Sequence, residues 1–73
     1  MKKLTKKQIE TIDFIQDYIN LMGHSPTRHE IADGLGININ AAQERVIGLI
    51  KKGALTQVDG AARTIKPVGG FSL

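Results

Sequence analysis

The apolar residues of this chain recur at helical spacing in three segments and then change to a strand-like pattern. In the first segment, Thr5 and Gln8 have the spacing of a capping box, Leu4 is placed to act as its staple, and Gly23 predicts the helix end. Between them runs an apolar stripe that is wide enough for a helix largely covered by partners. Its members are Ile9, Ile12, Ile15, Ile19 and Met22, widened by Phe14, Tyr18 and Leu21.

A second, shorter helix follows the connector that ends at Pro26. Thr27 and Glu30 repeat the capping-box spacing, and Gly36 can adopt the left-handed conformation that a tight turn between helices needs. The inward face of this helix consists of Ile31, Ala32 and Leu35. We therefore expect two helices joined by a short turn at this point.

The third helix begins after Asn38 or Asn40, since both are good N-caps. Asn38 is favoured, because the apolar residues then share one side, and Gly53 closes the helix. That inner side carries Ile39, Ala42, Val46, Leu49 and Ile50. The opposite side carries Asn40, Ala41, Glu44, Gly48 and Lys51, with Gln43, Arg45 and Ile47 on the flanks.

The last twenty or so residues favour strands. The segments 55–58 and 63–66 are β-prone and surround an Asp-Gly pair, which indicates a hairpin, and Pro67 ends the second strand. We expect residues 1–67 to form one domain and residues 68–73 a flexible tail, in which Phe71 can fold back on the core. The order helix, helix, helix, hairpin predicts a winged helix-turn-helix, mainly α with a small β-hairpin. Such a unit holds one helix where it can enter the major groove of DNA.

Composition limits the remaining classes. A length of 73 residues with 41% apolar content fits one small domain with its own core. The absence of cysteine excludes disulfides and thiolate sites. No apolar run has the length of a membrane span, and no apolar stretch follows the basic start as in a signal peptide. We therefore expect a cytoplasmic protein with no membrane partner.

The charge distribution favours an anionic partner. The net charge is +3, and the cations form three clusters along the chain. These clusters are Lys2, Lys3, Lys6 and Lys7, then Lys51 and Lys52, then Arg63 and Lys66. The acids Glu10, Asp13 and Asp17 recur at helical spacing and mark a separate solvated face.

Enzymatic sites find little support. His24 and His29 are five residues apart, so they share no helix face, and no third metal ligand accompanies them. The carboxylates of the first helix are explained by solvation, and Gly69-Gly70 is too slight to hold a phosphate. We predict no enzyme activity, no cofactor, no metal and no small-molecule substrate.

Nucleic-acid binding is better supported. Asn40 and Gln43 can pair with adenine, Glu44 can accept from the cytosine amino group, and the small Ala41 permits close approach. The first residues of two helices are suited to phosphate, since their free amides attract anions. The predicted phosphate ligands are Lys6, Lys7, Thr27, Arg28, Lys51, Lys52 and Arg63. Asp59 at the hairpin tip argues against deep insertion there.

Several motifs together resemble the N-terminal DNA-binding domain of the LexA repressor family, over roughly residues 1–67. They are MKKLTKKQ at the start, PTRHEIA from residue 26, Leu35-Gly, Asn40-Ala-Ala, Lys52-Gly and Gly60-Ala-Ala-Arg. The resemblance implies a winged helix-turn-helix that binds operators through its third helix. In the family an Asn-Ala-Ala-Glu-Glu run reads bases, which Asn40, Ala41 and Glu44 match. Lys7 stands where the family has a basic residue on the phosphates, and Arg28 matches the arginine of the family's Pro-Thr-Arg motif.

The chain departs from the family in a few places. Gln43 replaces the first Glu of the base-reading run, and Asp59 stands where a small polar residue is expected. The turn from Gly36 to Asn40 is one residue shorter than the family's Gly-Phe-Arg-Ser-Pro-Asn. The family's C-terminal domain, with its Ser–Lys self-cleavage dyad and dimerisation surface, has no counterpart in these residues, so we expect no autocleavage by this chain.

Two other functions stay open. Ile47 and Phe71 are apolar residues that would suit a protein-interaction module acting on a repressor or the transcription machinery. A continuous positive strip linking Lys7, Arg28 and Lys52 would instead favour DNA. An architectural DNA binder would bend DNA without a repressor-type operator. For the leading interpretation, double-stranded DNA is the partner, bound by two copies on a palindrome or with the help of a protein partner.

Overall fold

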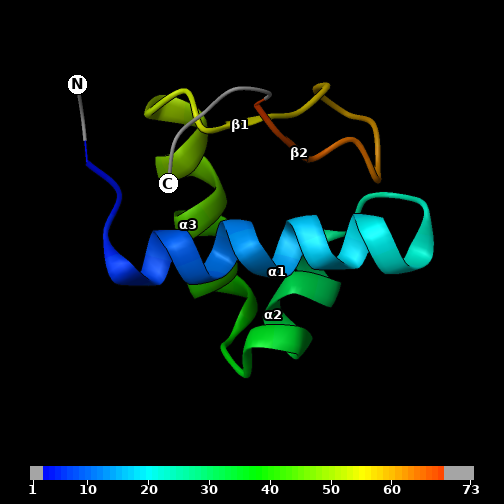
Figure 1. Ribbon diagram of the computed structural model, residues 1–73, viewed down its shortest axis with the longest axis horizontal. Helices are drawn as coiled ribbons and strands as arrows, with labels where there is room; N and C mark the ends of the chain where they lie inside the picture. Colours follow the sequence, from blue (N-terminus) through cyan, green and yellow to red (C-terminus); the bar gives the residue numbers. More distant parts are fainter. Residues whose placement is uncertain (1–2, 69–73) are drawn as a thin grey trace.

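The computed structural model describes residues 3–68, which form a helical unit with a small wing (Figure 1). Its helices are α1 (Lys6–Met22), α2 (Arg28–Leu35) and α3 (Ile39–Lys51), and its antiparallel strands are β1 (Leu55–Thr56) and β2 (Lys66–Pro67). This architecture confirms the predicted winged helix-turn-helix. Within residues 3–68, no helix is both long and apolar enough to cross a membrane. The predictions for Gly69-Gly70 and for the tail with Phe71 fall outside the described residues.

Each helix begins at its predicted cap. Thr5 and Thr27 both close complete capping boxes with the residue three positions on. Asn38 accepts a hydrogen bond from the Ala41 amide at 2.8 Å, so Asn38 and not Asn40 is the cap of α3. Gly36 has a φ of +67°, the left-handed conformation that the turn between α2 and α3 requires.

The core lies where α1 packs across the α2–α3 pair, with the wing closing it from above in Figure 1. The three helices, β1 and the residues next to the strands contribute apolar side chains to this core, which gives a short chain one shared hydrophobic centre. Its buried members are Ile12, Ile15, Ile31, Ala32, Ala42, Val46, Leu49, Ala54, Leu55 and Ile65.

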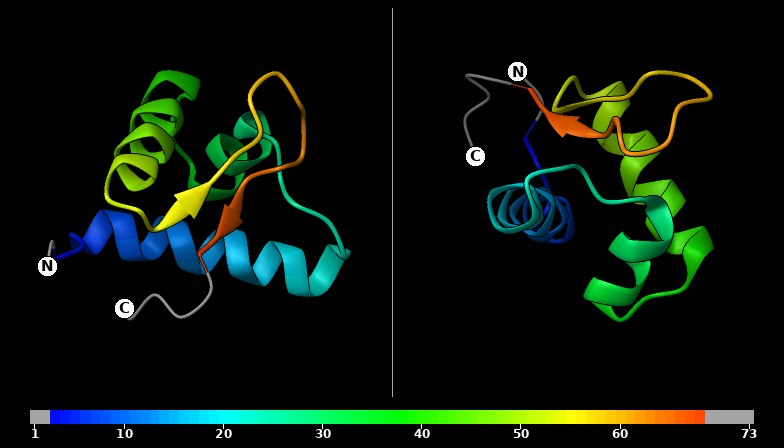
Figure 2. Two further views of the ribbon diagram at one scale, coloured as in Figure 1. Left: turned by 90° about the horizontal axis from the view of Figure 1, so that it is seen from above. Right: turned by 90° about the vertical axis from the view of Figure 1, so that its right-hand side faces the viewer.

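The predicted apolar stripes are wrong at their C-terminal ends. Leu21 is 82% exposed and Met22 is 54% exposed, because the last turn of α1 extends past the elements that cover its middle (Figure 2). Ile50, assigned to the inner side of α3, is 36% exposed. Helical spacing identified the correct side of each helix but not the length over which a partner covers it.

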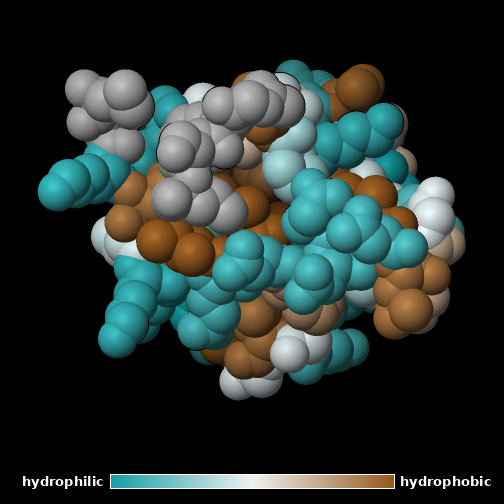
Figure 3. All heavy atoms as spheres, viewed as in Figure 1, coloured by the Kyte–Doolittle hydropathy of each residue, from teal (hydrophilic) through white to brown (hydrophobic). Residues whose placement is uncertain are grey.

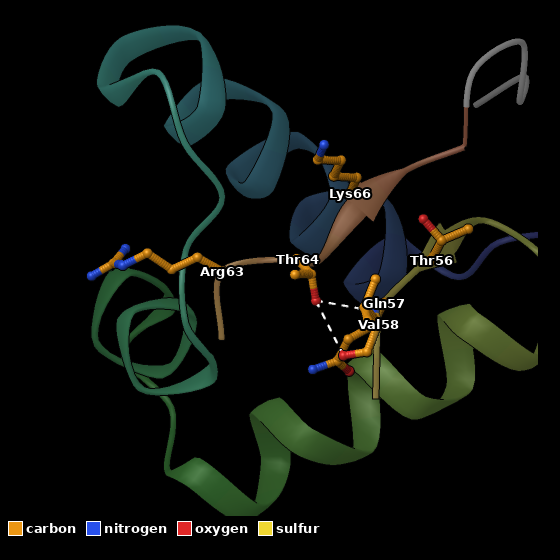
Figure 4. A pocket seen from close by; sticks show the side chains of 6 residues that line it. All are labelled: Thr56, Gln57, Val58, Arg63, Thr64 and Lys66. Carbon is orange, nitrogen blue, oxygen red and sulfur yellow. Dashed lines mark hydrogen bonds between the residues drawn. The ribbon is translucent and has the colours of Figure 1, made fainter. Parts of the chain in front are cut away.

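The wing is paired over a shorter stretch than predicted. Only Leu55 with Pro67 and Thr56 with Lys66 form a ladder, rather than the segments 55–58 and 63–66. Beyond them the Thr64 hydroxyl replaces backbone partners, since it accepts from the Val58 amide at 3.0 Å and donates to the Val58 carbonyl (Figure 4). Arg63 has a φ of +59°, which cannot continue a strand. At the other end, the Val68 amide donates to the Ala54 carbonyl at 3.0 Å.

Candidate nucleic-acid interface

The outward face of α3 presents the predicted base-reading residues together. Asn40 and Glu44 are exposed, while Ala41 and Gln43 are half-buried. The opposite face is anchored in the core by Ala42, Val46 and Leu49, each fully buried. Positions three and four apart in a helix are neighbours, so Asn40, Gln43 and Glu44 form one polar surface.

The exposed, apolar Ile47 lies one helical turn beyond this polar surface. It lies four residues after Gln43 and is 43% exposed. The sequence placed it on a flank of the helix and assigned it only to protein contacts. An exposed aliphatic group at this position also has the chemistry to contact a thymine methyl.

The N-terminus of α1 lies beside α3. A shallow hollow is lined by Thr5, Lys7 and Gln8 from α1 and by Ala41, Glu44 and Arg45 from α3. Lys7 therefore stands next to the predicted base-reading surface. Lys6 is also exposed, and it lines a second hollow together with Lys7 and the acidic row of Glu10, Asp13 and Asp17.

Two cations of α3 and its cap are engaged with α1 and with the segment that precedes it. The Lys52 ammonium donates to Gln8 Oε1 and to the Lys3 carbonyl, both at 2.7 Å. Arg45 Nη1 donates to the buried hydroxyl of Thr11 at 3.3 Å. These contacts fix α3 relative to α1, whereas Lys51 is exposed in the last turn of α3.

The predicted phosphate site at the start of α2 is shaped by neighbouring side chains. The Thr27 amide donates to Glu30 Oε1 at 2.8 Å, so the Glu30 carboxylate already lies at this helix N-terminus. Arg28 Nη2 donates to Gln57 Oε1 of the wing at 2.7 Å. Arg28 Nε is buried and has no hydrogen-bond partner in the part of the chain that is described.

Arg63 of the wing has partners within the protein. Its guanidinium donates to both carboxylate oxygens of Glu30, at 2.8 and 3.2 Å, and to the Ser25 carbonyl at 3.2 Å. The hydrogen bond from Arg63, followed by that from the Thr27 amide, lowers the pKa of Glu30 to about 2, and Glu30 raises the pKa of Arg63. Arg63 and Lys66 both line a shallow hollow of the wing, and Lys66 is exposed. Figure 4 shows the Arg63 side chain extending away from Gln57 and Val58.

The histidines lie near these contacts without forming a pair. His24 Nδ1 is 3.2 Å from Arg63 Nη1, and its ring meets that of Tyr18 edge-on. His29 is exposed in the first turn of α2.

Sequence reasoning missed the two contacts between wing and α2. Arg28 and Gln57 are 29 residues apart, and Glu30 and Arg63 are 33 apart. Helical or strand spacing carries no signal over such separations. The sequence contains Arg63 but does not show that its guanidinium reaches Glu30. Arg63 is predicted to bind phosphate because it flanks the expected hairpin.

The chain is similar to known repressors over the whole described region. A family model described as LexA DNA binding domain matches residues 1–64. The chain is 48% identical to the LexA repressor of Sodalis glossinidius and 46% identical to that of Saccharophagus degradans, in each case with 90% of the chain aligned to 33% of the relative. It is 43% identical to the LexA repressor of Thiobacillus denitrificans, with 100% of the chain aligned to 37% of that protein. The chain thus spans about a third of the length of these relatives.

Proposed function

Because the chain belongs to the LexA DNA-binding domain family, we propose that it binds double-stranded DNA sequence-specifically, as the DNA-binding domain of a transcriptional repressor. In this proposal α3 enters the major groove. One observation carries the proposal: the polar surface of Asn40, Gln43 and Glu44 is displayed on a helix whose other face is fully buried. A rigid helix with an exposed, side-chain-rich face is what base readout requires.

Each residue of the polar surface has a chemical role in this proposal. Asn40 and Gln43 offer paired donor and acceptor groups for adenine, and Glu44 accepts from the cytosine amino group. Ala41 allows the helix to approach the groove closely. Gln43 replaces a carboxylate of the family's run, so a base preference different from the family's is expected at that position.

Phosphate contacts surround this reading face. The predicted ligands Lys6, Lys7, Arg28 and Lys51 keep that role, and Lys7 lies beside α3. Thr27 keeps it through its hydroxyl, because its amide already donates to Glu30. Lys52 and Arg63 already donate to acceptors of the protein. We assign these two primarily to holding α3 and the wing in place, in contrast to the role expected from sequence.

A single domain of this size makes few phosphate contacts, so its affinity is expected to be modest and to fall steeply with salt. Two copies on a palindromic site would multiply that affinity. A protein partner that joins two domains would have the same effect. Action on chromosomal DNA would place the protein in the cytoplasm.

Selection of duplexes from a random pool tests the proposal directly. We expect one enriched motif, with a dyad if two copies bind. A pool that shows no enrichment would overturn sequence-specific binding and favour a protein-interaction module that uses the exposed Ile47. DNA bending without an enriched motif would instead support an architectural binder.

A further inference from the structure

We propose that Gln57 of the wing is a positioning residue that orients Arg28 for phosphate contact. This inference rests on the proposed DNA-binding function and assigns the wing a part in it. Gln57 directly follows β1 and is half-buried, and Arg28 is the first residue of α2. The hydrogen bond between them, at 2.7 Å, joins the two elements.

The hydrogen bond selects which edge of the guanidinium is presented. Nη2 donates to Gln57, and Nε on the same edge is buried against the protein. An arginine side chain has five N–H donors in a planar fork, so the donors of the opposite edge remain for a phosphate oxygen. Gln57 therefore defines the direction from which an anion can bind Arg28.

Pre-ordering is the energetic benefit of this contact. An arginine side chain has several rotatable bonds, and fixing them only when DNA arrives would reduce the affinity. Because Gln57 holds Arg28 in the free protein, that ordering precedes binding. The buried and unpaired Nε indicates that the side chain is held in a position that its own hydrogen bonding would not choose.

The acceptor of Arg28 is the uncharged amide of Gln57, and this distinguishes the contact from the ion pair of Arg63 with Glu30. The other arm of the wing is also tied to the first turn of α2, through Arg63 and the carboxylate of Glu30. A carboxylate neutralises the guanidinium that it holds, whereas the Gln57 amide leaves the charge of Arg28 available to an anion. Of the two guanidinium groups that link the wing and α2, Arg28 is the one that is held by an uncharged acceptor.

A double-mutant cycle tests the proposal with Gln57→Met, which keeps the length of the side chain and removes the acceptor. Binding is measured by fluorescence anisotropy on the selected duplex and on a random duplex, at several salt concentrations. We expect Gln57→Met to weaken binding to both duplexes by about threefold to tenfold, the range expected for the loss of one hydrogen bond. In the Arg28→Ala background the same substitution should have no effect.

Gln57→Glu separates position from charge. This variant keeps an acceptor for Arg28 but neutralises it, so we expect weaker binding together with a shallower dependence on salt. Gln16→Met is the matched control, since Gln16 is exposed on α1 and contacts only Asn20 through its side chain among the described residues. It should bind DNA like the wild type.

A measurement on the free protein adds a readout that does not depend on DNA. We expect the Arg28 Nε–H resonance to exchange slowly with solvent in the wild type and faster in Gln57→Met, with unchanged circular dichroism. Unchanged exchange, wild-type affinity in Gln57→Met, or an undiminished loss in the Arg28→Ala background would each overturn the proposal. Wild-type protein that binds no DNA would refute the proposed function itself, and the exchange measurement would still report on the contact.

Discussion

Arg63 of the wing donates two hydrogen bonds, of 2.8 and 3.2 Å, to the carboxylate of Glu30 in α2, which is 33 residues away in the sequence. The wing takes an unusual backbone conformation to do so, since Arg63 has a φ of +59° and is not a glycine. Such conformations persist only where the surrounding contacts stabilise them. The ion pair thus fixes the position of a loop whose own strands are only two residues long.

This ion pair predicts an acid-sensitive contribution to stability. The pKa of Glu30 is lowered from 4.5 to about 2, first by Arg63 and then by the Thr27 amide. Because the folded pKa lies below the unfolded one, the stabilisation is complete above pH 4.5 and is lost as the pH falls toward 2. We expect Glu30→Gln to lose less stability than the wild type across this window, as measured by urea unfolding. Arg63→Gln should flatten the profile as well, and a profile unchanged in both variants would contradict the prediction.

The packing of Phe14 on Gly34 predicts an unusual response to alanine. A Cβ on Gly34 would overlap the Phe14 ring, so α1 and α2 approach closely at this point. Gly34→Ala gains about 1 kcal/mol of helix propensity, but overpacking costs about 1–3 kcal/mol. We expect a net loss of unfolding free energy of order 1 kcal/mol in chemical denaturation. In the Phe14→Ala background, Gly34→Ala should become neutral or stabilising, and a loss of equal size there would rule out the ring as the cause.

The start of α3 predicts different consequences for two neighbouring asparagines. Asn38 caps the helix by accepting from the Ala41 amide, whereas Asn40 is exposed and is proposed to contact bases. We expect Asn38→Ala to cost about 1 kcal/mol of stability and Asn38→Gly only a few tenths. Asn40→Ala should change stability by no more than about 0.5 kcal/mol. Thermal unfolding of the three variants checks this assignment. Equal losses of stability on alanine substitution at Asn38 and at Asn40 would contradict it.

Base-reading and phosphate contacts predict different patterns of DNA binding. Asn40→Ala and Glu44→Ala are expected to change the sequence preference, with losses of about 1–3 kcal/mol on the selected site and little effect on random DNA. Arg28→Ala should weaken binding to all sequences by a similar factor and reduce the salt dependence. Gel-shift titrations on selected, singly substituted and random duplexes distinguish the two patterns. Equal effects of all three variants on every duplex would refute the assignment.

The charged side chains of α1 limit where DNA can approach the fold. The face viewed in Figure 3 is a mixture of hydrophilic and hydrophobic side chains. The acidic row of Glu10, Asp13 and Asp17 runs along α1 and lines one hollow with Lys6 and Lys7. DNA would be repelled from that row, so the phosphate contacts are expected on the α3 side of Lys7.

Local signals predicted the helices well because capping is a short-range property. The side chains of Thr5, Thr27 and Asn38 each bond an amide three residues away, so the sequence alone identifies them. The wing was predicted less well. Its second strand begins at Lys66, three residues later than expected, since Thr64 satisfies Val58 through a side chain and a positive φ at Arg63 delays the pairing.

The sequence by itself determined the order of the elements, their caps and the inner side of each helix, since all of these depend on spacing between near neighbours, and its motifs identified the family. Tertiary structure alone decided which cations find acceptors within the protein. Lys52 and Arg63 are engaged by groups far away in sequence, and Arg28 is held by Gln57 with its charge intact. The physical reason is that a charge near a helix end attracts any anion or acceptor, and only the folded chain shows which acceptor of its own comes within reach.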